Sequence, residues 1–403
     1  MRCPAFPSAV VASLFVLLLG SELSGQALAG ERQGEAVAET TIAAASSAQS
    51  PVLIDGWWVV ELTLQPAALP TPALKYRLLP SILEQKPGDA AAYYMKALIL
   101  FSPAVESCDD NTEVTMWDWL DTPVHELPKE DVKASLARFE GALQEVKYGS
   151  RRAHAQWALP LEESNFFSIL LPEVQETRRI ARVLLLRSRL HMAEGRFSEA
   201  VDDLQACYAM GRHVGEQPLL ISGLVGLAIC GMANQQVQGM MELPGSPNLY
   251  WALTNLPTPL IDIRPSLELE SKSVYLLFPM LAPEKRRGYS NEEAQVAMAA
   301  LLSKWREMAP MFDDQEASGV DSLLGGAALL GKLMLELPRA KADLVESGFD
   351  SKEVEAMAPA KVLLLHIGET FDRLGDEMFK WSSLPLWQSN EGLAKAEREL
   401  QSA

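Results

Sequence analysis

The residues with the clearest potential for ligand chemistry lie between Ser102 and Leu127, where two tryptophans stand among carboxylates. This stretch holds seven acidic residues and no lysine or arginine. An indole ring can stack on a sugar or a cation while nearby carboxylates accept hydrogen bonds. The candidate ligand-contact residues of this loop are Asp109, Asp110, Trp117, Asp118, Trp119 and Asp121. The alternative, which we favour, is that both tryptophans anchor a long loop onto the helices beneath it.

Other residues that could do chemistry are scattered. None of the five histidines belongs to an H-E-x-x-H motif, and no Cys/His pair has zinc-finger spacing. His366 and Glu369 could share a helix face, but two ligands do not make a metal site. The sequence also lacks a phosphate-binding G-x-x-x-x-G-K-[ST] motif and a G-x-S-x-G nucleophile motif. We therefore expect no catalytic, cofactor-binding or metal-binding residues, and we favour a role without catalysis while leaving an enzyme open.

Charged faces on two consecutive helices indicate ion pairs between them. Arg178, Arg182 and Arg189 lie within about 40° of one another at 100° per residue. The following helix carries acids along one face, namely Glu199, Asp202 and Asp203. We expect these arginines and acids to pair across the hairpin, and an anion site is the alternative.

Composition describes a folded, acidic protein. The 403 residues carry 53 acidic and 35 basic side chains, a net charge of −18, and 48% of them are hydrophobic. That apolar content is typical of a globular chain and excludes a wholly disordered one. Binding to nucleic acid requires a basic surface, so nucleic acid is excluded as the expected partner.

The first residues predict export. One arginine precedes an uncharged apolar run from Ala9 to Gly20, and Ala27-Leu28-Ala29 has the small-x-small pattern of a cleavage site. The run is shorter than the roughly 20 residues that span a bilayer. We expect a signal peptide over 1–29 that is cleaved after Ala29, then a flexible leader over 30–50, with a periplasmic or extracellular location. A retained N-terminal anchor is the alternative.

The rest of the chain predicts an all-α fold of irregular stacked helical hairpins. The short segment that precedes them near Val52 is expected to be either a strand or an extended arm, and the sequence leaves both open. Thr71-Pro72 predicts a helix over 73–85, Pro172 and Gly195 bracket another, and Ser290 with Glu293 forms a capping box. We expect a helical-hairpin domain over 51–257, a connecting segment over 258–289 and a C-terminal helical domain over 290–403.

One apolar segment requires a membrane test. Residues 219–233 are almost wholly apolar, yet the run stops at about 15 residues and has no flanking cluster of Lys or Arg. We expect a central core helix there and no membrane contact.

Cys207 and Cys230 flank the turn expected near Gly215, at distances that differ by about five residues, or roughly 7 Å of helical rise. This spacing favours buried free thiols over a disulfide, and both remain open.

Two resemblances complete the prediction. The run from Gly195 to Ala200, with Leu204 and Cys207, resembles the helix-turn-helix joint of a tetratricopeptide repeat, an α-solenoid module, over about 34 residues. Other segments resemble an uncharacterised family of secreted helical proteins of planctomycete bacteria. These segments are RSRLHMAEGRFSEAVDDL, PGSPNLYWALTNLPTPLIDIRPSLELE and FKWSSLPLWQ. This resemblance implies an exported helical protein and carries over no site residue. We expect a scaffold that binds another protein, and the alternative is an extracytoplasmic glycan-binding protein or hydrolase whose carboxylates come from distant segments.

Overall fold

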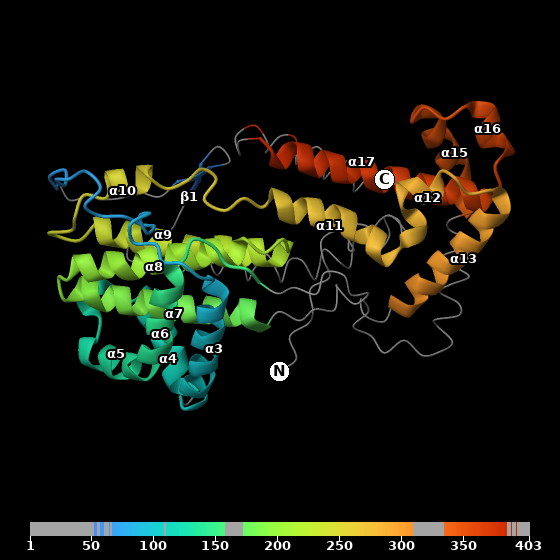
Figure 1. Ribbon diagram of the computed structural model, residues 1–403. Helices are drawn as coiled ribbons and strands as arrows, with labels where there is room; N and C mark the ends of the chain where they lie inside the picture. Colours follow the sequence, from blue (N-terminus) through green and yellow to red (C-terminus); the bar gives the residue numbers. More distant parts are fainter. Residues whose placement is uncertain are drawn as a thin grey trace. The chain divides into compact units, whose positions relative to one another are not determined.

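Figure 1 shows the computed structural model, which describes residues 52–54, 57–59, 64, 67–108, 110–157, 172–308, 334–384, 388 and 392. The predicted signal peptide and leader lie outside these residues. The fold is all-α, as predicted. The extended segment near its start is a short antiparallel hairpin in which β1 (Val52–Ile54) pairs with β2 (Trp57–Val59).

The described chain divides into two compact units, with the boundary between Ile263 and Arg264. This boundary differs from the expected connecting segment over 258–289. Helix α11 (Arg264–Leu277) packs against α17 (Pro359–Ser382), and its Val274 and Leu277 belong to the C-terminal core. Residues from 264 onward therefore fold with the C-terminal unit, because α11 carries an apolar face that α17 covers.

The N-terminal unit is a set of antiparallel hairpins around one core. Its helices are α3 (Ala90–Glu106), α4 (Asp110–Asp121), α5 (Lys129–Leu136), α6 (Glu140–Ser150), α7 (Pro172–Ala193), α8 (Phe197–Gly215), α9 (Leu220–Met241) and α10 (Tyr250–Thr254). Helices α7, α8 and α9 pack against one another, while α4 and α5 lie on α7 and α3 packs against α6 (Figure 1). A regular solenoid or tetratricopeptide array stays a prediction.

Local signals place the ends of α7 and α8. Pro172 is the first residue of α7, and Gly195 turns the chain with a φ of +73°, which a residue without a Cβ adopts at little cost. The predicted helix over 73–85 is wrong, because this segment consists of turns and bends. Pro80 lies in the middle of the window, where it removes a backbone donor and disfavours helical geometry at the preceding residue.

Helices α8 and α9 approach each other until their backbones touch. A Cβ on Gly226 would lie 2.5 Å from the carbonyl oxygen of Gly211 and 3.1 Å from the Cα of Gly215. No other residue type fits at Gly226 without moving backbone atoms. The two glycines at 211 and 226 therefore set the crossing point of this helix pair.

One face of α9 is not covered by the other described residues of the N-terminal unit. Val225, Ile229 and Cys230 are buried against the core, but Ile221 and Leu224 are 43% and 50% exposed. The expectation of a central helix is therefore correct for one side of α9 only. This is also the one described helix that is long and apolar enough to cross a membrane by length and composition, and half of its most apolar window is buried inside the protein.

The C-terminal unit has its own core around α17. Its other helices are α11, α12 (Pro283–Arg286), α13 (Asn291–Met308), α15 (Leu337–Glu346) and α16 (Ser351–Ala356). The predicted capping box is confirmed at the start of α13: the Ser290 amide donates to Glu293 Oε2 at 2.8 Å, and the Glu293 amide donates to Ser290 Oγ at 3.1 Å. The buried stripe predicted along α17 is confirmed at Leu364, Ile367 and Phe371.

Candidate functional site

The predicted ligand-contact loop is a helix. Asp110 begins α4 and Asp121 ends it, while Asp109 lies outside the described residues. Trp117 and Trp119 are two residues apart, so their side chains leave the helix about 200° apart. Both are half-buried and pack against the N-terminal core. Two rings on opposite sides of a helix cannot form one stacking platform, so the geometry favours the anchoring interpretation.

Arginines of α7 hold α4 in place. The Arg182 guanidinium lies 5.4 Å from the centre of the Trp117 ring, a cation–π distance. Arg189 donates to the carbonyl oxygen of Thr122, just beyond α4, and to Gln236 Oε1 of α9 at 2.9 Å. Burial lowers the pKa of Arg189 to about 10, although the Asp121 carboxylate opposes this shift. Arg182 and Arg189 therefore act as attachments between α7 and its neighbouring helices.

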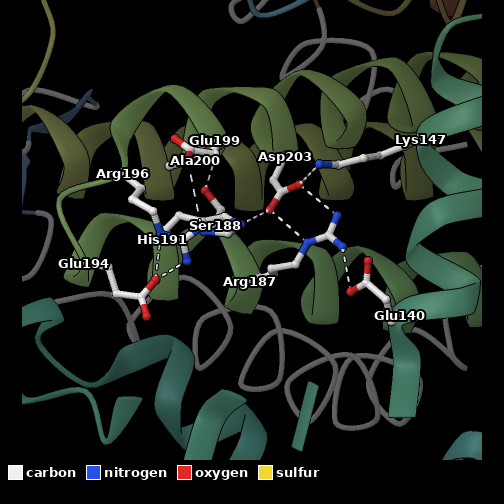
Figure 2. Close-up of polar contacts among 10 residues, drawn as sticks. All are labelled: Glu140, Lys147, Arg187, Ser188, His191, Glu194, Arg196, Glu199, Ala200 and Asp203. Atoms are coloured by element: carbon white, nitrogen blue, oxygen red, sulfur yellow. Dashed lines mark hydrogen bonds and ion pairs between the residues drawn. The ribbon is translucent and has the colours of Figure 1, made fainter. Parts of the chain in front are cut away.

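A second set of charged residues, absent from the candidates, converges on Asp203 in the middle of α8 (Figure 2). Asp203 is fully buried and accepts two hydrogen bonds from Arg187, from Nε at 3.0 Å and from an Nη atom at 2.8 Å. Lys147 of α6 lies 3.0 Å from the same carboxylate. Such a fork-to-fork contact is among the strongest polar contacts in proteins. We call Asp203, Arg187, Lys147 and His191 the Asp203 cluster.

The remaining contacts nearly neutralise the Asp203 cluster. His191 Nε2 lies 3.4 Å from Asp203, and burial lowers the pKa of this imidazole, which keeps it uncharged near neutral pH. Glu140 approaches Arg187 at 3.3 Å and offsets the second positive charge. Because Asp203 is enclosed by these protein groups, the cluster locks α6, α7 and α8 together rather than offering an open carboxylate to a substrate.

An ion pair does join α7 to α8, but the arginine predicted to form it is wrong. Asp203 meets Arg187, whereas Arg182 and Arg189 turn toward α4 and α9. Glu199 lies 3.9 Å from Arg196, the residue that precedes α8. Periodicity shows which residues share a helix face, but it does not show which neighbour that face meets. The signal that could have pointed to Arg187 is its place directly after the apolar run Val183–Leu186.

A third set lies in the C-terminal unit, where α15 and α17 enclose a pocket of about 300 Å³. Carboxylates from both helices line it, namely Asp343, Glu369, Asp372, Asp376 and Glu377. His366 also lines the pocket, 3.7 Å from Asp343, and burial lowers its pKa. Glu369, which the spacing paired with His366, instead accepts hydrogen bonds from Arg286 at 3.1 Å and Arg287 at 2.8 Å.

No metal site follows from these residues. Within the described part of the chain, no three His, Cys, Asp or Glu side chains lie close enough together to hold a metal ion.

A scan against protein-family models found no match, and neither did searches of the curated proteins and of the solved structures.

Proposed function

We propose that this chain is an exported helical protein that binds another protein through the outer face of α9. The observation that carries the proposal is the exposed apolar surface formed by Ile221, Leu224 and Leu227, of which Leu224 is half exposed. Gly231 continues this surface, because a Cβ there would meet no atom within 4 Å. Exposed apolar patches on folded proteins mark interaction sites more often than isolated exposed leucines do.

The charge distribution describes the partner. No charged residue lies between Glu216 and Glu242, the two acids that bracket α9, and the whole chain carries a net charge of −18. A partner surface that fits this face is an apolar stripe with lysines or arginines at its two ends. An amphipathic helix lying along α9 has this form, with contacts at positions i, i+3, i+4 and i+7.

Two further observations support binding rather than catalysis. The Asp203 carboxylate of α8, an acid that could have served a reaction, is committed to helix–helix contacts with Arg187 and Lys147. The apolar run at Ala9–Gly20 and the resemblance to secreted planctomycete proteins support export. Export and protein binding together describe an extracytoplasmic scaffold.

The decisive experiment is co-purification from the native cell envelope, followed by a binding measurement with the recovered partner. Leu224→Asp places a charge in the middle of the α9 surface. Val296→Asp on α13 is the matched control, because Val296 is 72% exposed and lies in the other unit. We expect Leu224→Asp to weaken partner binding at least tenfold and Val296→Asp to leave it unchanged, with both variants as stable as the parent chain.

Two results would contradict the proposal. One is a clean monomer from the envelope that turns over glycans or peptides. The other is binding to lipid vesicles, lost in Leu224→Asp, with no protein partner recovered, which would make the α9 surface a membrane contact.

The pocket between α15 and α17 favours the alternative, a hydrolase or glycan-binding protein. Carboxylates from two helices meet there, as general acid–base hydrolysis requires. Asp376→Asn and Glu377→Gln test this function. Loss of glycan turnover in both variants, with unchanged turnover in Leu224→Asp, would support the hydrolase over the scaffold.

A further inference from the structure

Cys207 and Cys230 contact each other's helices reciprocally. Cys207 Sγ on α8 lies 4.0 Å from the carbonyl oxygen of Ile229, the neighbour of Cys230. Cys230 Sγ on α9 lies 4.0 Å from the carbonyl oxygen of Tyr208, the neighbour of Cys207. Each thiol is therefore directed at the turn of helix that carries the other one.

The register of the two helices sets the cysteines opposite each other. Gly211 and Gly226 touch at the crossing point. Cys207 lies four residues before Gly211 on α8, and Cys230 lies four residues after Gly226 on the antiparallel α9. Since four residues are about one helical turn on each helix, both cysteines lie one turn from the crossing on the same side.

The spacing that disfavoured a bridge in the sequence does not hold in the structure. The turn occupies residues 216–219, so Cys207 lies eight residues before the end of α8 at Gly215, and Cys230 lies ten residues after the start of α9 at Leu220. The difference is two residues instead of five, and the backbone contact at the glycines brings opposed positions closer than in an ordinary helix pair.

We propose that Cys207 and Cys230 form an intramolecular disulfide that joins α8 to α9 under oxidising conditions. Both Sγ atoms lose their protons and a bond forms between them. The two electrons pass to a disulfide oxidant, such as oxidised glutathione or an oxidoreductase, which is reduced to two thiols. Cys108, Cys207 and Cys230 are free thiols in the structure.

Burial determines when the bond forms. Cys207 is fully buried and Cys230 is 2% exposed. Burial also raises the pKa of the Cys230 thiol to about 12, which suppresses the reactive thiolate in the folded protein. Oxidation therefore occurs while the chain folds, before α8 and α9 enclose both sulfurs. Once formed, the bond is shielded from reductants in the folded protein and becomes reducible when the chain unfolds.

The experiment is oxidative refolding of the full-length chain in a glutathione buffer, followed by alkylation of free thiols and peptide mapping. This design does not depend on where the chain is located or what it binds, so it separates the disulfide from the proposed export. We expect Cys3 and Cys108 to be alkylated and the peptides of Cys207 and Cys230 to be linked. Reduction should then lower the Tm by roughly 5–10 °C, because the bridge closes a loop of about 23 residues.

Matched variants make the result specific. The Tm of Cys108→Ser should fall on reduction as in the parent chain, while the Tm of the double variant Cys207→Ser/Cys230→Ser should be insensitive to reductant. The proposal is overturned if refolded, helical protein yields Cys207 and Cys230 as alkylated or glutathione-linked peptides. It is overturned equally if reduction lowers the Tm of the double variant as much as that of the parent.

Discussion

Among the described residues, each unit of this protein has one charged side chain with no exposed surface, and the two side chains have opposite charge. In the N-terminal unit a fully buried acid, Asp203, is surrounded by Arg187, Lys147 and His191. In the C-terminal unit a fully buried base, Arg286, is surrounded by Glu369 and Asp372 and also donates to the carbonyl oxygen of Leu281 at 2.7 Å. In both units the buried charge joins separate helices, α8 to α7 and α6 in the N-terminal unit and α12 to α17 in the C-terminal unit.

The two sites differ in how far their partners can reach water. The side chain of Arg187, which holds Asp203 through two hydrogen bonds, is 9% exposed and only Lys147 reaches 30%, whereas Glu369 and Asp372, the two acids that hold Arg286, are 18% and 35% exposed. Burial alone would lower the pKa of Arg286, but the hydrogen bonds and charges of Asp372 and Glu369 outweigh it and raise this pKa. Partners that remain near water can be rehydrated when the buried charge is removed, and enclosed partners cannot. The N-terminal unit should therefore depend more on its buried charge.

The largest effect is expected for Asp203→Ala. The substitution leaves the enclosed Arg187 guanidinium with only the exposed Glu140 carboxylate, 3.3 Å away, as its counter-charge. Removal of the main partner of a buried charge costs about 3–5 kcal/mol of unfolding free energy. Urea unfolding followed by circular dichroism measures this loss. Glu199→Ala on the same helix is the control, with a loss below about 0.5 kcal/mol, because Glu199 is half exposed. Equal losses in the two variants would remove the basis of the comparison.

The second largest effect is a loss of stability in acid, and it is expected in the N-terminal unit, where a buried histidine must take up a proton. His213 is 4% exposed, its Nδ1 lies 2.7 Å from the Tyr94 hydroxyl, and burial lowers its pKa to about 4. The unfolded imidazole titrates near 6.5, so the unfolded chain binds more protons between these values, and stability falls as the pH falls from 6.5 to 4. The loss should reach about 3 kcal/mol at the lower end. Urea unfolding at several pH values measures it, and His213→Asn should flatten the profile over this range.

Arg286→Met should lower the free energy of unfolding by about 1–3 kcal/mol, which is less than for Asp203→Ala. The reason is that Glu369 retains its ion pair with Arg287 and that Asp372 can be hydrated. The same denaturation assay applies. Arg287→Met, at a side chain that is 60% exposed, is the control and should change stability by less than about 1 kcal/mol. A loss from Arg286→Met larger than that from Asp203→Ala would reverse the ranking of the two sites.

The smallest effect is expected at α4. Trp117→Ala removes the ring beneath Arg182 and part of the contact with α7, which should cost about 1–2 kcal/mol. Thermal unfolding measures this loss, and glycan binding by Trp117→Ala and Trp119→Ala provides the second readout. Unchanged stability together with lost glycan binding would restore the ligand-contact interpretation of this segment.

Sequence patterns predicted most of what depends on neighbouring residues. Pro172, Gly195 and the Ser290–Glu293 box mark helix ends correctly, because capping depends on groups within about one turn. The helix expected over 73–85 failed where Pro80 interrupts it. The acidic tryptophan segment was predicted as a loop because it is polar, yet it is helical where α7 supports it.

By itself, the amino-acid sequence determined that this chain is helical and acidic and where many of its helices begin. Tertiary structure alone decided that Asp203 meets Arg187, that Cys207 faces Cys230 and that one side of α9 stays open. The reason is geometric: helix periodicity is set by hydrogen bonds four residues apart, while pairing between helices depends on the register at which glycines such as Gly211 and Gly226 let two backbones meet.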